Sequence, residues 1–262
     1  MSIVRTLILG INLAALAGLA ACAPQRGDAE VGTRPPTILV AADGTGGVAG
    51  SLYEVALDDS ESTELGSLPV GFTGLAFDGR GDLYGVESGG GAGAQLWLMD
   101  PRNPDPEVIG PLVDATGGAH SQMPDITFSG AILFGWTERS DGPVTIDPET
   151  GEVTTLGGGT SSHGSGLAAD SADAIWSAPQ GPTGQLFSVD PETGQVNPGP
   201  TLSGSFRESI NSMTFVNGTL YGVAANNGAD QKDLVTIDTE SGEIVLIGSL
   251  PARIDSLAGF PP

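Results

Sequence analysis

One repeated unit constrains the fold of this chain more than any other feature of its sequence. In each copy an alternating strand ends in Asp, a turn and a second strand follow, and after a loop comes a strand resembling Gly-Leu-Ala-Phe and then one resembling Leu-Tyr-Gly-Val. The Asp recurs every 42 to 48 residues, at Asp58, Asp100, Asp147, Asp190 and Asp238. Regular units of this length, each with four short strands, are typical of β-propeller blades.

The segment after the repeated Asp has the composition of a tight turn. It reads Asp-Pro-Glu-Thr-Gly at 147–151 and at 190–194, and Asp-Thr-Glu-Ser-Gly at 238–242. Proline presets φ for a type I turn, the Asp side chain can accept from the backbone N–H two residues on, and glycine can take the left-handed conformation. The flanking strands alternate apolar with polar or small residues, and no segment after residue 36 keeps a helical apolar period. We therefore predict hairpins and almost no helix.

The two ends of the chain carry complementary parts of one blade. The last repeat stops after its Gly-Leu-Ala-Phe-like strand at 255–260, and the strand that should follow it stands at 37–42. This split predicts a ring closed by the C-terminal inner strand pairing with the N-terminal strand. Residues 37–260 give about 45 residues to each of five blades, which suits four strands and their loops. We predict an all-β, five-bladed β-propeller of four-stranded blades; a β-sandwich, which would not require a split repeat, is the alternative.

The repeated segments resemble those of bacterial β-propeller proteins of the broad NHL, SMP-30 and quinoprotein-like type. They read IDPETG at 146–151, VDPETG at 189–194, GLAFDGRGDLYGV at 74–86 and LVTIDTESGEIVLIGSL at 234–250. The resemblance extends over the whole chain after the first 36 residues. It implies the fold and says little about function, because these motifs form strands and turns, whereas function on this fold lies in the loops.

The first 21 residues have the features of an export signal. Arg5 supplies a positive charge, an apolar run follows, and it ends in Leu19-Ala20-Ala21-Cys22, which resembles the lipobox of bacterial lipoproteins. Cys22 is the only cysteine of the chain and cannot form an intrachain disulfide. We expect residues 1–21 to be a lipoprotein signal peptide and Cys22 to be acylated with palmitate. An ordinary cleaved signal with an incidental cysteine is the alternative.

The residues after the cysteine predict a tethered protein of the cell envelope. Residues 22–36 contain Pro, Gly and charge without an apolar period, so we expect a lipidated cysteine and a flexible tether, followed by the propeller at 37–262. Ala23 stands where an Asp would signal retention in the inner membrane, which indicates the outer membrane, facing the periplasm or the exterior. We expect contact with the membrane through the lipid alone, and a monomer.

The charge of the chain excludes one class of partner. There are 32 Asp and Glu residues against 9 Lys and Arg, a net charge of −23. Such a field repels nucleic acid, so we expect no nucleic-acid partner. Acidity that only keeps the surface hydrated explains the charge without a specific cationic partner.

The loops that lead from the outermost strand of one blade to the innermost strand of the next gather at one mouth of a propeller. Here they are residues 69–73, 113–125, 158–165, 203–211 and 251–255, and they differ between blades whereas the strands repeat. Both histidines of the chain lie in them. The candidate ligand-binding residues are His120, Gln122, Asp125, His163, Arg207, Asn211, Arg253 and Asp255.

Three of these residues suggest a metal site on the axis. Asp125, Asn211 and Asp255 stand near the starts of inner strands, and we expect them to converge there as possible metal ligands. Oxygen ligands meeting at one point suit calcium. SMP-30-like hydrolases and paraoxonase-like lactonases hold a catalytic calcium in such a position, but they usually have six blades and a further Glu, for which Glu208 is the nearest match.

No sequence motif assigns catalytic residues or a cofactor. We therefore expect a non-enzymatic binding or scaffold module of the cell envelope, with a protein or glycan partner. A calcium-dependent hydrolase, lactonase or lyase with its site at the channel mouth is the alternative. Solvated loop residues without any function would explain the same positions.

Overall fold

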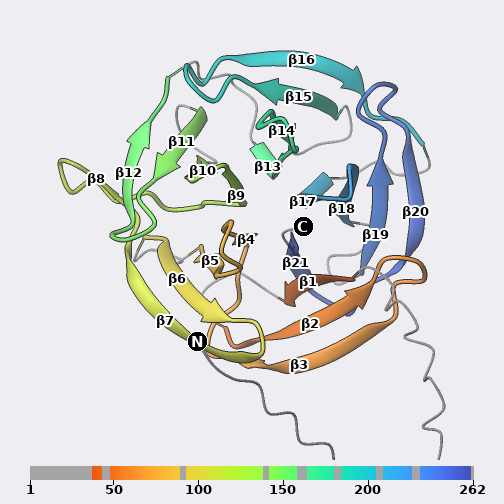
Figure 1. The fold of residues 1–262 in the computed structure, drawn as a ribbon, viewed down its shortest axis with the longest axis horizontal. Coiled ribbons are helices and arrows are strands. Elements are labelled where there is room, and N and C mark those ends of the chain that lie inside the picture. Colours follow the sequence, from red (N-terminus) through yellow and green to blue (C-terminus); the bar gives the residue numbers. More distant parts are fainter. Residues whose placement is uncertain are drawn as a thin grey trace, which may run out of the picture. The chain divides into compact units, whose positions relative to one another are not determined.

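The computed structural model describes residues 37–42, 48–88, 93–137, 142–157, 164–179, 184–204, 209–225 and 231–260. Within these ranges the regular elements are all strands, and they form five sheets arranged around one axis (Figure 1). The predicted five-bladed, all-β propeller is confirmed. The predicted signal peptide, Cys22 and the predicted tether lie outside the described residues.

The described part of the chain contains no helix that is long and apolar enough to span a membrane.

Each blade is an antiparallel sheet, and its strands are named here from the one nearest the axis outwards. The closing blade consists of β21 (Ile254–Gly259), β1 (Thr37–Ala42), β2 (Gly50–Ala56) and β3 (Ser62–Leu68), and the next of β4 (Gly74–Phe77), β5 (Leu83–Glu87), β6 (Gln95–Asp100) and β7 (Asn103–Pro111). The third has β9 (Ile126–Ser129), β10 (Ile132–Thr137), β11 (Gly142–Ile146) and β12 (Glu152–Thr155). The fourth has β13 (Gly164–Ala169), β14 (Ile175–Pro179), β15 (Gln185–Val189) and β16 (Val196–Thr201), and the fifth has β17 (Ser209–Val216), β18 (Thr219–Ala225), β19 (Lys232–Ile237) and β20 (Ile244–Ser249).

The ring closes as the split repeat predicts. In Figure 1 the dark-blue β21 lies beside the orange-red β1, which in turn pairs with β2. Leu39 is the register partner of Ala258 on one side and of Glu54 on the other. The inner strand of this blade thus comes from the end of the chain and its other three strands from the beginning, which confirms the predicted closure.

A short strand, β8 (Val113–Asp114), was not expected from the repeat. It lies in the connection to the third blade and pairs in parallel with the outermost strand of that blade, β12. It adds a fifth strand to the sheet because the connection between blades runs alongside the sheet edge before it turns inward.

Small residues let the inner strands approach one another closely. A Cβ atom placed on Gly74 would lie 2.8 Å from the Cα atom of Asp125 on the next blade. A Cβ atom on Gly259 would lie 2.9 Å from the carbonyl oxygen of Phe215. Real Cβ atoms do not approach backbone this closely, so glycine at these positions is needed for the inner ring to pack.

The repeated turns form as predicted. The carboxylates of Asp147, Asp190 and Asp238 accept hydrogen bonds from the backbone N–H two residues on, at 2.8, 2.8 and 2.9 Å. Gly194 closes its turn with a φ of +69°. It also touches the neighbouring blade, since a Cβ atom there would lie 2.6 Å from the carbonyl oxygen of Gly157. The turn glycine therefore both ends a hairpin and packs one blade against the next.

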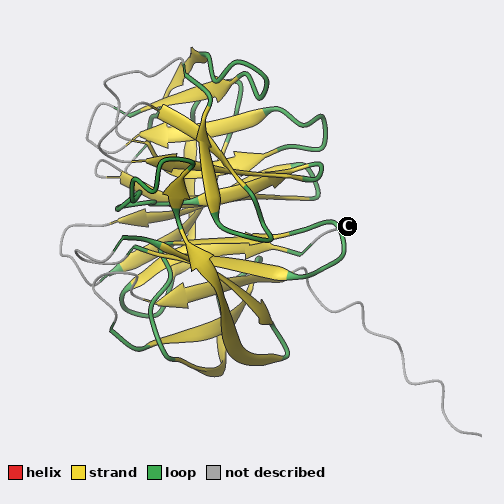
Figure 2. Ribbon diagram, turned by 90° about the vertical axis from the view of Figure 1, so that its left-hand side faces the viewer, coloured by secondary structure: helices red, strands yellow, loops and turns green. Residues whose placement is uncertain are grey.

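Two faces of the ring follow from the strand directions. The mouth face carries the loops that lead into the innermost strands, and the hairpin face carries the turns after the innermost strands and the repeated Asp turns. Figure 2 shows the strands from the side, with loops on both sides of the strand layer. The core lies between neighbouring sheets: Leu96 and Leu112 of one blade pack with Ile126, Leu133 and Ile146 of the next, all of them buried.

Candidate functional site

The carboxyl group of Asp125 lies among the inner strands of three blades. Asp125 precedes β9 and is 0% exposed. Its Oδ2 atom accepts hydrogen bonds from the backbone N–H of Leu167 on β13 at 2.8 Å and of Met213 on β17 at 3.1 Å. Its Oδ1 atom accepts from the N–H of Ile126 at 3.0 Å, and the Ser212 hydroxyl also donates to the carboxyl. One side chain thus connects the inner strands of three blades.

The surroundings of Asp125 do not suit a cation ligand. Burial raises the pKa of its carboxyl well above the usual value, and the hydrogen bonds from Leu167, Met213, Ile126 and Ser212 oppose this rise only in part. Both carboxyl oxygens face the positive ends of N–H or O–H dipoles. A cation at these oxygens would meet the same positive ends, so the geometry favours a structural role for this carboxyl.

The strand register offsets Asp125 by one position from the other two predicted oxygen ligands. Ile126 pairs with Gly135 and Met213 pairs with Gly222, so Asp125 corresponds to Ser212, the residue before Met213. Asn211 and Asp255 therefore stand one position nearer the mouth than Asp125 does. Asn211 and Asp255 lie at β-bulges, where the register of β17 shifts between Ile210 and Ser212 and that of β21 between Ile254 and Ser256.

Asn211 and Asp255 do come together at the mouth face. The Asn211 Nδ2 atom donates to Asp255 Oδ1 at 2.5 Å, and Ser209 Oγ donates to Asn211 Oδ1 at 2.8 Å. Both residues are half-buried. Within the described ranges, no three His, Cys, Asp or Glu side chains are grouped closely enough to hold a metal ion.

The other predicted residues of the mouth face lie in two places. His120 and Gln122 are half-buried in the connection from β8 to β9, and among the described residues the buried atoms His120 Nε2 and Gln122 Oε1 have no hydrogen-bond partner. Arg253 is exposed just before β21, with a φ of +64°. His163 and Arg207, like Glu208, fall outside the described residues.

A pocket that the sequence did not reveal lies on the hairpin face. It has a volume of about 720 Å³ and opens where the inner strands β13, β17 and β21 end. Its polar and aromatic lining residues include Asp170, Trp176, Phe215, Asn217, Thr239 and Phe260. In the sequence, Phe215 is the last residue but one of β17 and Phe260 directly follows β21, but only the packing of separate repeats brings them to one pocket.

Aromatic rings form the walls of this pocket. Phe260 stacks on Phe77 of the neighbouring blade, with ring centroids 5.0 Å apart and planes at 28°, and it remains 39% exposed. The Trp176 indole is fixed by its Nε1–H, which donates to Asp170 Oδ2 at 3.2 Å. Asp170 Oδ1 accepts in turn from the backbone N–H groups of Ala172 and Ala174 at 2.8 and 3.0 Å.

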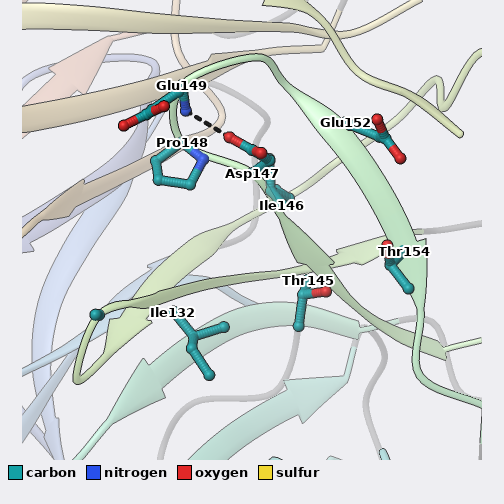
Figure 3. A pocket seen from close by; sticks show the side chains of 9 residues that line it. Ile132, Thr145, Ile146, Asp147, Pro148, Glu149, Glu152 and Thr154 are labelled. Atoms are coloured by element: carbon teal, nitrogen blue, oxygen red, sulfur yellow. Dashed lines mark hydrogen bonds between the residues drawn. The ribbon is translucent and has the colours of Figure 1, made fainter. Parts of the chain in front are cut away.

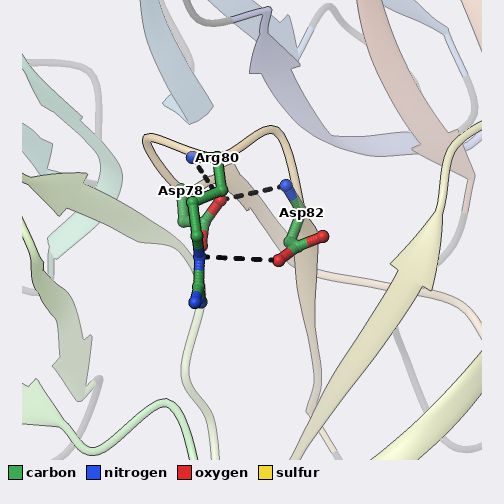
Figure 4. Close-up of polar contacts among 3 residues, drawn as sticks. All are labelled: Asp78, Arg80 and Asp82. Carbon is green, nitrogen blue, oxygen red and sulfur yellow. Dashed lines mark hydrogen bonds and ion pairs between the residues drawn. The ribbon is translucent and has the colours of Figure 1, made fainter.

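The same turn in another blade carries a different interaction. Asp78, which directly follows β4 as Asp170 follows β13, bonds to Arg80 instead of an indole (Figure 4). Arg80 Nε lies 2.9 Å from Asp78 Oδ2 and 3.7 Å from Asp82 Oδ2. Although burial alone would raise the pKa of Asp78, hydrogen bonds from the Asp82 N–H and from Arg80 hold it below the usual value. The turn is common to both blades, and the side chain it holds differs.

A second pocket on the hairpin face is acidic. It has a volume of about 520 Å³ and is lined by Ile132, Thr145, Asp147, Glu149, Glu152 and Thr154 (Figure 3). The Asp147 carboxylate in it accepts from the Glu149 N–H, as in the other repeated turns. No aromatic ring is among its lining residues, which distinguishes it from the pocket at Phe260.

Comparisons with known proteins support the fold and no narrower family. No family model and no curated protein matches the sequence. A chain of a crystallised nidogen/laminin complex superimposes with a TM-score of 0.56 at 12% identity, covering 85% of this chain and 97% of that one. A protein of unknown function from Bacteroides caccae gives 0.52 at 14% identity, covering 87% and 100%. TolB from Acinetobacter baumannii gives 0.49 at 16%, covering 81% of this chain and 52% of that chain.

At these identities the two superpositions with TM-scores of 0.56 and 0.52 show the fold alone and nothing of its ligands. The NHL, SMP-30 and quinoprotein-like resemblance of the repeats therefore stays a prediction, apart from the propeller fold itself.

Proposed function

We propose that this chain is a lipid-anchored propeller of the bacterial cell envelope that binds a protein or glycan partner. The observation that carries the proposal is the pocket at Phe260, an open hollow with a partly exposed aromatic wall and a polar rim. Sites that recognise ligands are concave, with apolar and aromatic walls and a few placed polar groups. The lipobox-like segment ending at Cys22 supports the envelope location.

The calcium-dependent hydrolase has less support. Its central ligand would be Asp125, whose oxygens accept backbone N–H groups from two other blades. The other two predicted ligands, Asn211 and Asp255, are hydrogen-bonded to each other. These contacts are explained by the packing of the inner ring, so we do not propose catalysis at the mouth.

The binding proposal is tested by cosedimentation with envelopes. A chain that begins at Ala23, labelled at its N-terminus, is mixed with envelopes of the cells that produce it, and binding is measured with and without excess unlabelled chain. We expect saturable binding that Phe260→Ala weakens and that Ile132→Ala, at another pocket on the same face, leaves unchanged. Absence of saturable binding would overturn the proposal.

The anchor is tested separately. We expect radiolabelled palmitate to enter the full chain, and Cys22→Ala to abolish that labelling and release the protein from the membrane fraction or leave it unprocessed. The physical reason is that the lipid supplies the whole membrane affinity of an acidic protein, whose full chain has a net charge of −23. Equal membrane association of both forms would disprove the lipoprotein assignment.

A further inference from the structure

We infer that the pocket at Phe260 binds a neutral saccharide, an inference that rests on the proposed binding function. Phe77 stacks on Phe260 at an interplanar angle of 28°, and Phe260 remains 39% exposed while lining the pocket. An aromatic face carries the negative part of the ring quadrupole and attracts the C–H groups on one side of a pyranose ring. Because stacking on Phe77 holds the ring in place, little side-chain freedom is lost when a ligand covers it.

The second wall of the pocket is also preorganised. The Trp176 indole cannot rotate freely because its Nε1–H is bonded to Asp170, whose other oxygen accepts two backbone N–H groups. Trp176 is half-buried and lines the same pocket as Phe260 and Phe215. Rings from three blades thus line a hollow of about 720 Å³, within the size range of small-ligand pockets.

The polar rim has the donors and acceptors that sugar hydroxyls require. Asn217, Thr239 and Ser171 line the pocket, and an amide and two hydroxyls supply both donors and acceptors. Asn217 and Gly218 have φ values of +49° and +80° and form the tight turn between β17 and β18. The amide therefore stands on a rigid turn beside the aromatic walls, which is how planar polar groups are placed to read the hydroxyls of a ring.

The negative charge of the protein favours a neutral saccharide over an anionic one. The chain carries a net charge of −23, and the charged residue of the pocket is an Asp. A uronic acid or a sulfated sugar would be repelled by this field. A small cation would find an aromatic wall too, but the Asp170 oxygens accept one indole and two backbone N–H groups, which leaves the neutral ligand as the better match.

The test is a binding assay on the chain that begins at Ala23. The probes are cellohexaose, xylohexaose, maltohexaose and N-acetylchitohexaose as neutral saccharides, with hexagalacturonate and choline as anionic and cationic comparators. We expect at least one neutral probe to bind with a dissociation constant of about 0.1 mM, and in any case below about 1 mM. Binding is measured by calorimetry and by the change in tryptophan fluorescence. Binding of hexagalacturonate or choline alone, or of no probe, would overturn the inference.

Two variants and one control locate the site. Phe260→Ala removes the stacking face, and Asn217→Gly removes the amide while retaining a residue that readily adopts the turn's positive φ. We expect each variant to weaken binding of the neutral probe at least tenfold. The Asn217→Gly chain should keep the melting temperature of the parent. Ile132→Ala, an exposed apolar residue in the acidic pocket, should bind as the parent does. Unchanged affinity in both variants would place the saccharide elsewhere and overturn the assignment.

The outcomes separate this inference from the proposed function. If envelopes bind the chain saturably and Phe260→Ala weakens that binding, but no neutral probe binds or competes, the saccharide is wrong and the binding function stands. If envelopes do not bind saturably and no probe binds, both are wrong.

Discussion

The Asp125 side chain contributes to stability through groups that are distant in sequence. Asp125→Ala would leave the buried N–H groups of Leu167 and Met213 without their acceptor and open a cavity between the inner strands. Each unsatisfied buried donor costs about 1–3 kcal/mol. We expect the free energy of unfolding to fall by about 3 kcal/mol or more in urea at pH 7. Asp147→Ala, in an exposed turn, is the matched control and should cost about 1 kcal/mol; an equal loss in both would contradict the central role of Asp125.

The raised pKa of Asp125 also predicts a pH dependence. The folded chain binds the Asp125 proton more tightly than the unfolded chain, whose carboxyl titrates near the usual 3.8. The contribution of this group to stability is therefore greatest below that value and is lost as the pH rises through the raised pKa of the folded state. Carboxylates with lowered pKa values, such as Asp78 and Asp190, act in the opposite direction as the pH falls.

The measurement is the difference between the parent chain and Asp125→Asn, because the common carboxylates cancel in it. We expect the parent to lose unfolding free energy relative to the variant as the pH is raised from about 4, in urea titrations at successive pH values. Parallel curves would show that Asp125 titrates alike in the folded and unfolded states.

The contacts of individual residues across blades could not be predicted from the sequence. The Asp125 carboxyl accepts hydrogen bonds from residues 42 and 88 positions away, and no local pattern reports such contacts. The one-position offset between Asp125 and the pair Asn211 and Asp255 became visible only through the pairing partners of each strand. The histidine and arginine at 163 and 207 lie outside the described residues, so their prediction stays untested.

At the scale of elements, the repeated hairpins were predictable and their contacts were not. The residues of the turn predict the positive φ of Gly194, because this φ depends only on the turn itself. Its close approach to Gly157 of the preceding blade depends on how two sheets pack. The pocket at Phe260 was missed for the same reason, because Trp176, Phe215 and Phe260 come from separate repeats.

Comparing two glycines separates these contributions. Gly194→Ala forces an alanine into a left-handed conformation and drives its Cβ atom against a backbone carbonyl, whereas Gly81, with a φ of +89°, has open space around a Cβ atom. We expect Gly81→Ala to lower the free energy of unfolding by about 1 kcal/mol and Gly194→Ala by at least about 2 kcal/mol, measured by urea denaturation. Equal losses would mean that the turn adjusts without disturbing the neighbouring blade.

At the scale of the whole molecule, the number of blades and the closure were both predictable because the repeat is regular and one copy is divided between the two ends. Closure predicts that the terminal strands depend on each other. Deleting residues 37–42 or residues 256–260 exposes unpaired strand edges in the closing blade, so we expect either truncation to abolish cooperative thermal unfolding. Deleting residues 23–34 is the control and should leave the melting temperature unchanged. A truncated closing blade that melts like the parent would refute the closure.

The divided blade also determines when folding can finish. A chain synthesised from its N-terminus makes β1, β2 and β3 first, yet their innermost neighbour, β21, consists of residues 254–259 and is made last. Until then the inner edge of β1 has no partner, and an unpaired strand edge promotes aggregation. A chain that stops before residue 254 therefore cannot complete the closing blade, and the edge of β1 that faces the axis stays open to strands of other molecules.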